Sequence, residues 1–188
     1  MCLEARTESL RAHVAACVVR HAVADIQLAS GALSDFYFDG RVVTLTGEPL
    51  ALFAHRVLGE LERLEATALG GPTIGADPIV GAALALGAEA GRSLKGFLVR
   101  KEPKARGLRK QVEGPSLDGS RALLVEDTVT SGGSLLMAAE AVRREHPGCT
   151  IAGALTLVDR EEGGAERLAA AGIPLTAVFT KSDFGAAV

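Results

Sequence analysis

Two adjacent acids, Glu126 and Asp127, stand at the end of an apolar run and directly before a turn of hydroxyl-bearing residues and glycines. The run, residues 122–125, is short and partly β-branched, which is typical of a strand buried on both faces of a parallel sheet. Alanines recur at helical spacing from residue 138 onward, so a helix is expected after the turn. Residues 128–134 therefore form a strand-to-helix loop, whose backbone N–H groups and hydroxyls can bind a phosphate.

The paired acids restrict what this loop can bind. Two carboxylates repel a phosphate, so their presence favours a ligand that also offers hydroxyls or a metal ion. A sugar phosphate offers both. The chain contains no Gly-Lys-Ser or Gly-Lys-Thr, and no Gly-x-Gly-x-x-Gly opens a helix, so triphosphate and dinucleotide binding lose their main support.

Residues 125–134, Val-Glu-Asp-Thr-Val-Thr-Ser-Gly-Gly-Ser, resemble the phosphoribosyl pyrophosphate (PRPP) signature of type I phosphoribosyltransferases. Two further segments are similar to orotate phosphoribosyltransferases: residues 28–39, with Leu-Ala-Ser-Gly and Tyr-Phe-Asp, and the basic segment 99–114. The three signatures occur in the family's order. The chain departs from the family at Ala29, where many members have Lys.

The composition agrees with one α/β domain. The chain has 188 residues, 48% of them hydrophobic, with one Tyr, six Phe and no Trp, so its core must be aliphatic. The resemblance implies the type I phosphoribosyltransferase fold, a central mainly parallel sheet flanked by helices, with a small N-terminal β-containing hood. We expect a single phosphoribosyltransferase domain over 1–188, with the hood segment at 1–45 and the PRPP-binding core at 66–180.

Charge and cysteine content indicate where the protein works. A net charge of −3 gives no global attraction to nucleic acid or to an anionic membrane. The three cysteines are scattered without metal-ligand spacing, which favours reduced thiols. The N-terminal residues do not resemble a signal peptide, and no apolar run reaches spanning length. We expect a cytoplasmic protein with no nucleic-acid or membrane partner.

The elements that position the acids follow from the apolar periodicity. Tyr37 and Phe38 in the expected hood either pack in the core or stack on a planar base. The loop 75–77 follows a strand and, in the family, meets the pyrophosphate; a simple tight turn is the alternative. We expect helices at 3–22, 47–64, 78–90, 163–171 and after 133, and strands at 26–31, 35–39, 66–71, 96–100, 122–125, 150–158 and 174–180.

A basic segment follows the strand expected at 96–100. Pro103 and Gly107 discourage a regular helix there, and the segment lies between two strands of the sheet, where it can fold over the site. A solvated loop and an RNA-binding loop are the alternatives, although aromatic residues for base stacking are missing. The segment resembles the family's mobile catalytic loop, which crosses a dimer interface and covers the neighbouring subunit's site. Its basic residues are Arg100, Lys101, Lys104, Arg106, Arg109 and Lys110.

The resemblance implies transfer of the phosphoribosyl group from PRPP to orotate in de novo pyrimidine biosynthesis, giving orotidine 5′-monophosphate and pyrophosphate. It implies a homodimer and Mg²⁺ bound mainly through substrate and water, with no metal ligand set from the protein. A phosphoribosyltransferase for another base and a non-catalytic PRPP-binding regulator are the alternatives.

The residues that the resemblance assigns fall into three groups. Arg106 stands where a His is common in the family, so charge neutralisation is expected of it rather than proton transfer. The catalytic residues are Lys104, Arg106, Glu126 and Asp127; the PRPP-binding residues are Arg100, Lys101, Lys104, Arg106, Glu126, Asp127, Thr128, Val129, Thr130, Ser131, Gly132, Gly133 and Ser134; the orotate-binding residues are Thr130 and Arg160.

Overall fold

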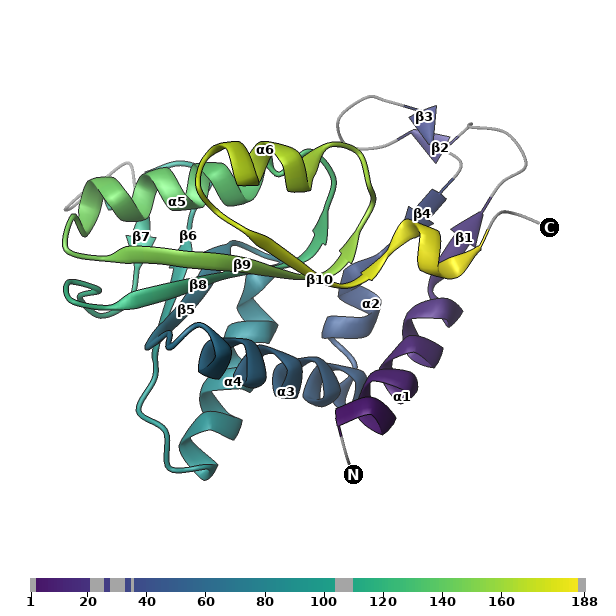
Figure 1. Ribbon diagram of the computed structural model, residues 1–188, viewed down its shortest axis with the longest axis horizontal. Helices are drawn as coiled ribbons and strands as arrows, with labels where there is room; N and C mark the ends of the chain where they lie inside the picture. Colours follow the sequence, from purple (N-terminus) through teal and green to yellow (C-terminus); the bar gives the residue numbers. More distant parts are fainter. Residues whose placement is uncertain (1–2, 21–25, 28–32, 35, 104–109, 186–188) are drawn as a thin grey trace.

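The computed structural model describes residues 3–20, 26–27, 33–34, 36–103 and 110–185. It has a central six-stranded sheet in the order β10-β9-β8-β5-β6-β7, with helices on both faces (Figure 1). All neighbouring strands are parallel except β7, which is antiparallel to β6. The strands are β5 Ala68–Pro72, β6 Lys95–Val99, β7 Val112–Glu113, β8 Arg121–Val129, β9 Thr150–Asp159 and β10 Leu175–Thr180. The predicted fold class is confirmed.

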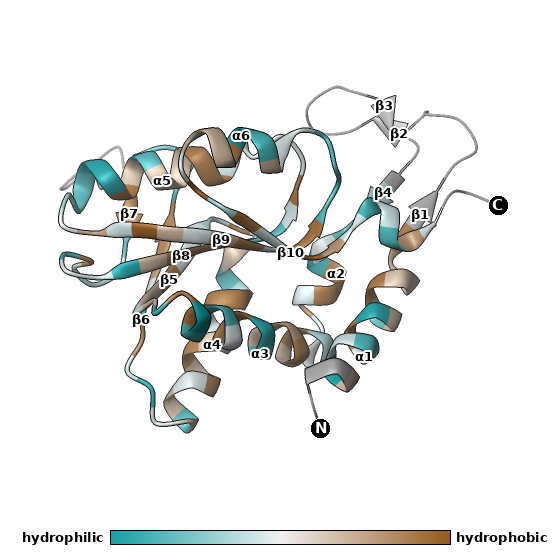
Figure 2. Cartoon of the chain, in the orientation of Figure 1, coloured by the Kyte–Doolittle hydropathy of each residue, from teal (hydrophilic) through white to brown (hydrophobic). Residues whose placement is uncertain are grey.

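Two helix layers cover the sheet because side chains alternate between its faces. Leu123 and Val125 of β8 belong to the apolar core shared with α3 Gly47–Arg63 and α4 Ala76–Glu89. Ala122 and Leu124 belong to the core on the opposite face, shared with α5 Gly133–Glu145 and α6 Gly164–Ala170. Figure 2 shows polar residues recurring between apolar ones along α3, as a helix with one solvated face requires.

The N-terminal region contains a helix, small antiparallel pairs and a short connecting helix. Strand β1 Val18–Arg20 pairs with β4 Phe36–Phe38, and β2 Ile26–Gln27 pairs with β3 Leu33–Ser34, in agreement with the expected β-containing hood. The prediction of a helix over 3–22 was wrong at its C-terminal end. Helix α1 Leu3–Ala16 stops before β1, where two valines favour the extended conformation and pairing with β4. The short elements α2 Gly40–Thr44 and η1 Lys181–Phe184 were not predicted.

The other predicted helices and sheet strands agree with the structure to within about two residues at each end, except for the strand that carries the acids. That strand, β8, does not stop at Val125 but continues to Val129, because β9 pairs with it as far as the Val129–Asp159 register. Its other neighbour, β5, pairs with it only as far as Leu124. Glu126 and Asp127 therefore lie on a strand that has a partner on one side only.

The sheet order places a switch point between β5 and β8, because the chain moves from β5 outward to β6 and β7 and then returns to β8 on the other side. Ligands of open α/β sheets bind at the carboxyl ends of the strands at such a point. Within the described ranges, no helix is long and apolar enough to cross a membrane.

Candidate active site

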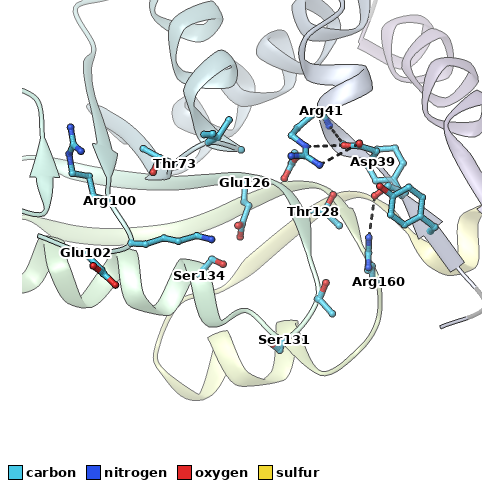
Figure 3. A pocket seen from close by; sticks show the side chains of 18 residues that line it. Asp39, Arg41, Thr73, Arg100, Glu102, Glu126, Thr128, Ser131, Ser134 and Arg160 are labelled. Carbon is cyan, nitrogen blue, oxygen red and sulfur yellow. Dashed lines mark hydrogen bonds and ion pairs between the residues drawn. The ribbon is translucent and has the colours of Figure 1, made fainter. Parts of the chain in front are cut away.

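A cavity of about 1060 Å³ opens at the carboxyl ends of β5 and β8 (Figure 3). Five segments that are distant in sequence contribute to its wall. They are the hood and the start of α2 at 37–41, the β5–α4 loop at 73–75, the segment after β6 at 100–102, the end of β8 with its turn at 126–128, 130, 131 and 134, and Arg160 after β9.

Most of the residues singled out in the sequence meet in this cavity: Arg100, Lys101, Glu126, Asp127, Thr128, Thr130, Ser131, Ser134 and Arg160. Val129 does not line it, since its side chain is buried in the core beside α5. Gly132 and Gly133 do not line it either; they form the start of α5. Lys104 and Arg106 lie outside the described residues, so their placement stays a prediction.

Glu126 is held in an environment that opposes its charge. Burial at the end of β8, together with the neighbouring charge of Asp127, raises the pKa of Glu126 to about 8, although a hydrogen bond with the Ser134 side chain acts in the opposite direction. At neutral pH the ligand-free site therefore keeps much of this carboxyl group protonated.

Asp127 occupies a slot between two glycines. A Cβ added to Gly40 would lie 2.7 Å from Asp127 Oδ2, and one added to Gly75 would lie 2.9 Å from Oδ1. Burial raises the pKa of Asp127, while a backbone hydrogen bond at Thr128 and the charge of Arg41 act to lower it. The two glycines thus leave room for the carboxylate in one place and restrict its movement.

The turn after β8 presents polar groups to the cavity from the N-terminus of α5. Gly132 has φ 72°, a left-handed conformation that glycine adopts without strain, and it directs the chain into the helix. Thr128 Oγ1 is buried and has no hydrogen-bond partner within the described part of the chain. Because the first N–H groups of a helix also have no partner within the helix, this corner is suited to an anion.

Arg160 connects the sheet to the hood. Its side chain is buried, and its Nη2 donates a hydrogen bond to the Phe38 carbonyl at 3.1 Å. Burial lowers the pKa of Arg160, and its Nε has no hydrogen-bond partner among the described residues. Tyr37 and Phe38 both belong to the cavity wall. The Phe38 side chain is buried in the core, whereas Tyr37 is 37% exposed, so Tyr37 is the one of the two that is available to stack on a ligand.

The opposite end of the cavity is exposed and basic (Figure 3). Arg100 Nε forms an ion pair with Glu113 Oε1 at 2.9 Å, and its side chain is 48% exposed. Lys101 and Glu102 are also exposed. Among the described residues, no group of three or more His, Cys, Asp or Glu side chains is arranged to hold a metal ion.

Several lining residues were missed in the sequence: Gly40, Arg41, Thr73, Ile74 and Glu102. Arg41 Nε lies 3.1 Å from Asp39 Oδ1, and both residues line the cavity. Arg41 was detectable, because it follows the hood signature by two residues. For Thr73 and Ile74, the only indication in the sequence that they line the cavity was their position after a predicted strand. Of the loop 75–77, Gly75 lines the cavity and Asp77 does not.

Comparison with known proteins gives a consistent result. No family model matches the chain. A protein of Streptomyces avermitilis named orotate phosphoribosyltransferase is 45% identical over 161 residues, covering 85% of this chain and 87% of that protein.

Two solved structures are of orotate phosphoribosyltransferase from Mycobacterium tuberculosis. The structure in complex with Fe(III) dicitrate has a TM-score of 0.77 and 36% identity. The structure in complex with PRPP has a TM-score of 0.74 and 34% identity. Each covers 96% of this chain and 98% of the solved chain.

Proposed function

The chain belongs to the orotate phosphoribosyltransferase family, and we propose that its cavity transfers the 5-phosphoribosyl group of PRPP to orotate through the residues described above. The enzyme is a pentosyltransferase of pyrimidine biosynthesis, and its products are orotidine 5′-monophosphate and pyrophosphate. The observation that supports the residue assignment most directly is the joining of a half-buried acid pair, a helix N-terminus and a buried arginine in one cavity.

The hood and the core have different parts in this proposal. Residues 1–188 form one phosphoribosyltransferase domain, with the hood segment at 1–45 and the PRPP-binding core at 66–180. The strands of the main sheet all lie within that core range, and the small antiparallel pairs lie within the hood range. The hydrogen bond from Arg160 to the Phe38 carbonyl joins the two parts at the cavity.

The corner between β8 and α5 binds the phosphoribosyl group. Thr130, Ser131 and Ser134, which line the cavity, bind the 5′-phosphate with their hydroxyls, and the N-terminus of α5 at Gly132 and Gly133 supplies positive potential behind them. Glu126 and Asp127 accept hydrogen bonds from the ribose hydroxyls, and Thr128 supplies its unpartnered hydroxyl. Charge-assisted hydrogen bonds of this kind are about twice as strong as neutral ones.

Orotate lies on the hood side of the ribose. The guanidinium of Arg160, which lines the cavity and has an Nε without a partner among the described residues, binds the orotate carboxylate, because its planar fork matches a planar acid group. Thr130 contributes a hydroxyl, and the half-exposed Tyr37 ring stacks on the base. In the transfer, the bond from ribose C1 to pyrophosphate breaks, the bond to orotate N1 forms, and the proton on N1 passes to the released pyrophosphate. Positive charge develops on the ribose in this step. The half-buried Asp127 carboxylate next to it stabilises that charge, and Glu126 accepts a ribose hydrogen bond whether or not it carries its proton.

Magnesium fits this site through the substrate. The acid pair offers oxygen atoms to the cavity, and Mg²⁺ characteristically retains water and binds substrate oxygens together with one or two carboxylates. When bound, Mg²⁺ supplies positive charge to the pyrophosphate. Arg100 and Lys101 supply further charge, as do Lys104 and Arg106 outside the described residues.

A homodimer completes the site in this proposal, with the segment 100–114 of one subunit acting on the cavity of the other. Exposed apolar side chains near the cavity support a protein interface there: Ile74 is 67% exposed, Val42 of α2 is 54% exposed, and Leu45, which caps the end of α2, is 69% exposed. Mixing a Lys104→Ala variant with an Asp127→Asn variant should restore activity if the segment acts between subunits. No recovery in a mixed dimer would place it in its own subunit.

We also propose that the enzyme works in the cytoplasm without nucleic-acid or membrane partners. The net charge of −3 and the scattered thiols support this location.

Release of pyrophosphate tests the function directly. With PRPP and Mg²⁺ present, adding orotate should start the release, whereas adenine, hypoxanthine or uracil should not. Turnover with one of the other bases instead would identify a different phosphoribosyltransferase. PRPP binding with no turnover on any base would identify a regulator.

A further inference from the structure

Gln111 is a buried polar residue at the point where the chain returns from the basic segment to β7. Its side chain is 6% exposed, and its amide Nε2 lies 2.8 Å from the Arg100 carbonyl and 3.3 Å from the Lys101 carbonyl. The Arg100 amide in turn donates a hydrogen bond to the Gln111 carbonyl at 3.0 Å. Gln111 therefore holds the backbone of the two basic residues through its side chain as well as through the strand ladder.

Helix α5 holds Gln111 from the other side. The Glu145 carboxylate accepts hydrogen bonds from the backbone N–H groups of Gln111 and Val112 at 3.0 and 3.1 Å. Arg144 Nη2 donates a hydrogen bond to the side-chain Oε1 of Gln111 at 2.8 Å. Burial acts against the charge of Glu145, but these backbone hydrogen bonds and Arg144 lower its pKa overall, so it is a carboxylate at neutral pH. The amide of Gln111 thus has partners for both its donor and its acceptor.

The same helix carries part of the cavity. Ser134, in the first turn of α5, lines the cavity, and Met137 follows three residues later with its Sδ 3.1 Å from Gln111 Nε2. Met137, Arg144 and Glu145 lie on one face of the helix, because they are seven and eight residues apart. Gln111 is itself absent from the cavity wall. Its contacts connect a helix at the phosphate corner with the backbone of the two cations.

We propose that Gln111 is a positioning residue that fixes the backbone of Arg100 and Lys101 against α5, so that their side chains meet the pyrophosphate of PRPP. The proposal rests on the proposed function. It assigns to Gln111 a role that packing alone does not require, since an apolar side chain of the same length would fill the space but leave two carbonyl groups without this donor.

The test is a Gln111→Met variant, which keeps the length of the side chain and removes the amide. With Mg²⁺ present, its dissociation constants for PRPP and for pyrophosphate should rise about five- to tenfold, as expected for one or two lost hydrogen bonds. The dissociation constant for orotidine 5′-monophosphate should stay within about twofold of the unchanged protein, because that ligand has no pyrophosphate for Arg100 and Lys101 to bind. Isothermal titration calorimetry measures all three.

Arg143→Met is the matched control, because it also removes a bond from a side chain to a carbonyl, here Ala171, at the same end of α5. It should change none of the three dissociation constants. If Gln111→Met does not fold, Arg144→Met replaces it; this variant removes the donor to Gln111 Oε1 and should produce the same selective loss at about two- to threefold.

Equal weakening of all three ligands, or no weakening of any, would overturn the positioning role. Failure of the unchanged protein to bind PRPP would be a different result: it would overturn the proposed function, and this inference with it.

Discussion

The two ends of the cavity are built differently. At the hood end, Asp127 sits between two glycines and Arg160 is buried with its Nη2 bound to a backbone carbonyl. At the other end, Arg100 is 48% exposed and Lys101 is also exposed, on a segment that begins and ends at the short antiparallel pair of β6 and β7. The first end fixes geometry before a ligand arrives. The second supplies charge, and its order depends on backbone anchors such as Gln111.

The balance of charge explains why both ends are needed. Among the described residues that line the cavity, the basic side chains are Arg41, Arg100, Lys101 and Arg160, and the acidic ones are Asp39, Glu102, Glu126 and Asp127. Because burial keeps much of Glu126 protonated at neutral pH, the lining carries only a small net positive charge, which cannot neutralise a ligand as anionic as PRPP. In the proposed function, Mg²⁺ and the basic residues of 104–110 supply the difference.

Replacing Arg160 should have the largest effect, because the change removes the buried cation that is proposed to pair with the orotate carboxylate. Arg160→Met should raise the activation free energy for the reaction with orotate by about 2–5 kcal/mol, which lowers kcat/KM for orotate roughly 30- to 4,000-fold. PRPP binding should be nearly unchanged. Arg160→Lys is the control: it keeps the charge but loses the planar fork, and should recover only part of the activity. A uniform loss of affinity for both substrates would show that the variant disrupts the docking of the hood instead.

Replacing Asp127 should have the next largest effect. Asp127→Asn keeps the shape of the side chain between Gly40 and Gly75 and removes a charged hydrogen-bond acceptor. The activation free energy should rise by about 1.5–3 kcal/mol, so kcat/KM should fall roughly 10- to 150-fold. Asp39→Asn is the matched control, because that carboxylate also lines the cavity but is paired with Arg41. Steady-state kinetics with PRPP decides the matter. Equal losses in the two variants would argue that Asp127 acts only through the charge of the cavity.

The raised pKa of Glu126 predicts that the free energy of unfolding of the protein without substrate decreases as the pH rises. The pKa rises from 4.5 in the unfolded chain to about 8 in the fold, so the group's contribution to stability is full below pH 4.5 and is lost as the pH rises through about 8. From pH 5 to pH 9, the free energy of unfolding should therefore fall further in the unchanged protein than in Glu126→Gln. The difference should be on the order of 1–2 kcal/mol, allowing for water at this partly exposed carboxyl.

Urea unfolding at the two pH values measures this difference. Glu102→Gln, which removes an exposed carboxylate of the same cavity, should follow the unchanged protein. Parallel curves for all three proteins would mean that burial does not oppose the charge of Glu126.

The buried end of the cavity was also the more predictable one. The apolar run at 122–125 and the turn at 128–134 have local signals, and the structure brings Glu126, Asp127 and most of the turn together. What the sequence did not reveal depends on distant partners: β8 reaches Val129 because β9 pairs with it, and Gly40 meets Asp127 across the cavity. The anchoring of Gln111 by α5 likewise joins residues far apart in the chain, with no local pattern to indicate it.

The exposed end should give the smallest effect, and salt should distinguish it from the buried end. Lys101→Met should raise KM for PRPP only about two- to fivefold at low ionic strength, since an exposed cation interacts through water. This difference should shrink as salt is added and the screening length falls from about 10 Å at 0.1 M toward about 3 Å at 1 M. The loss in Asp127→Asn should persist over the same range, because water and ions do not enter the slot between Gly40 and Gly75 as readily. If both variants lost their effect in salt to the same degree, the cavity would be uniformly solvated, and the contrast between a preformed end and a charge-supplying end would not hold.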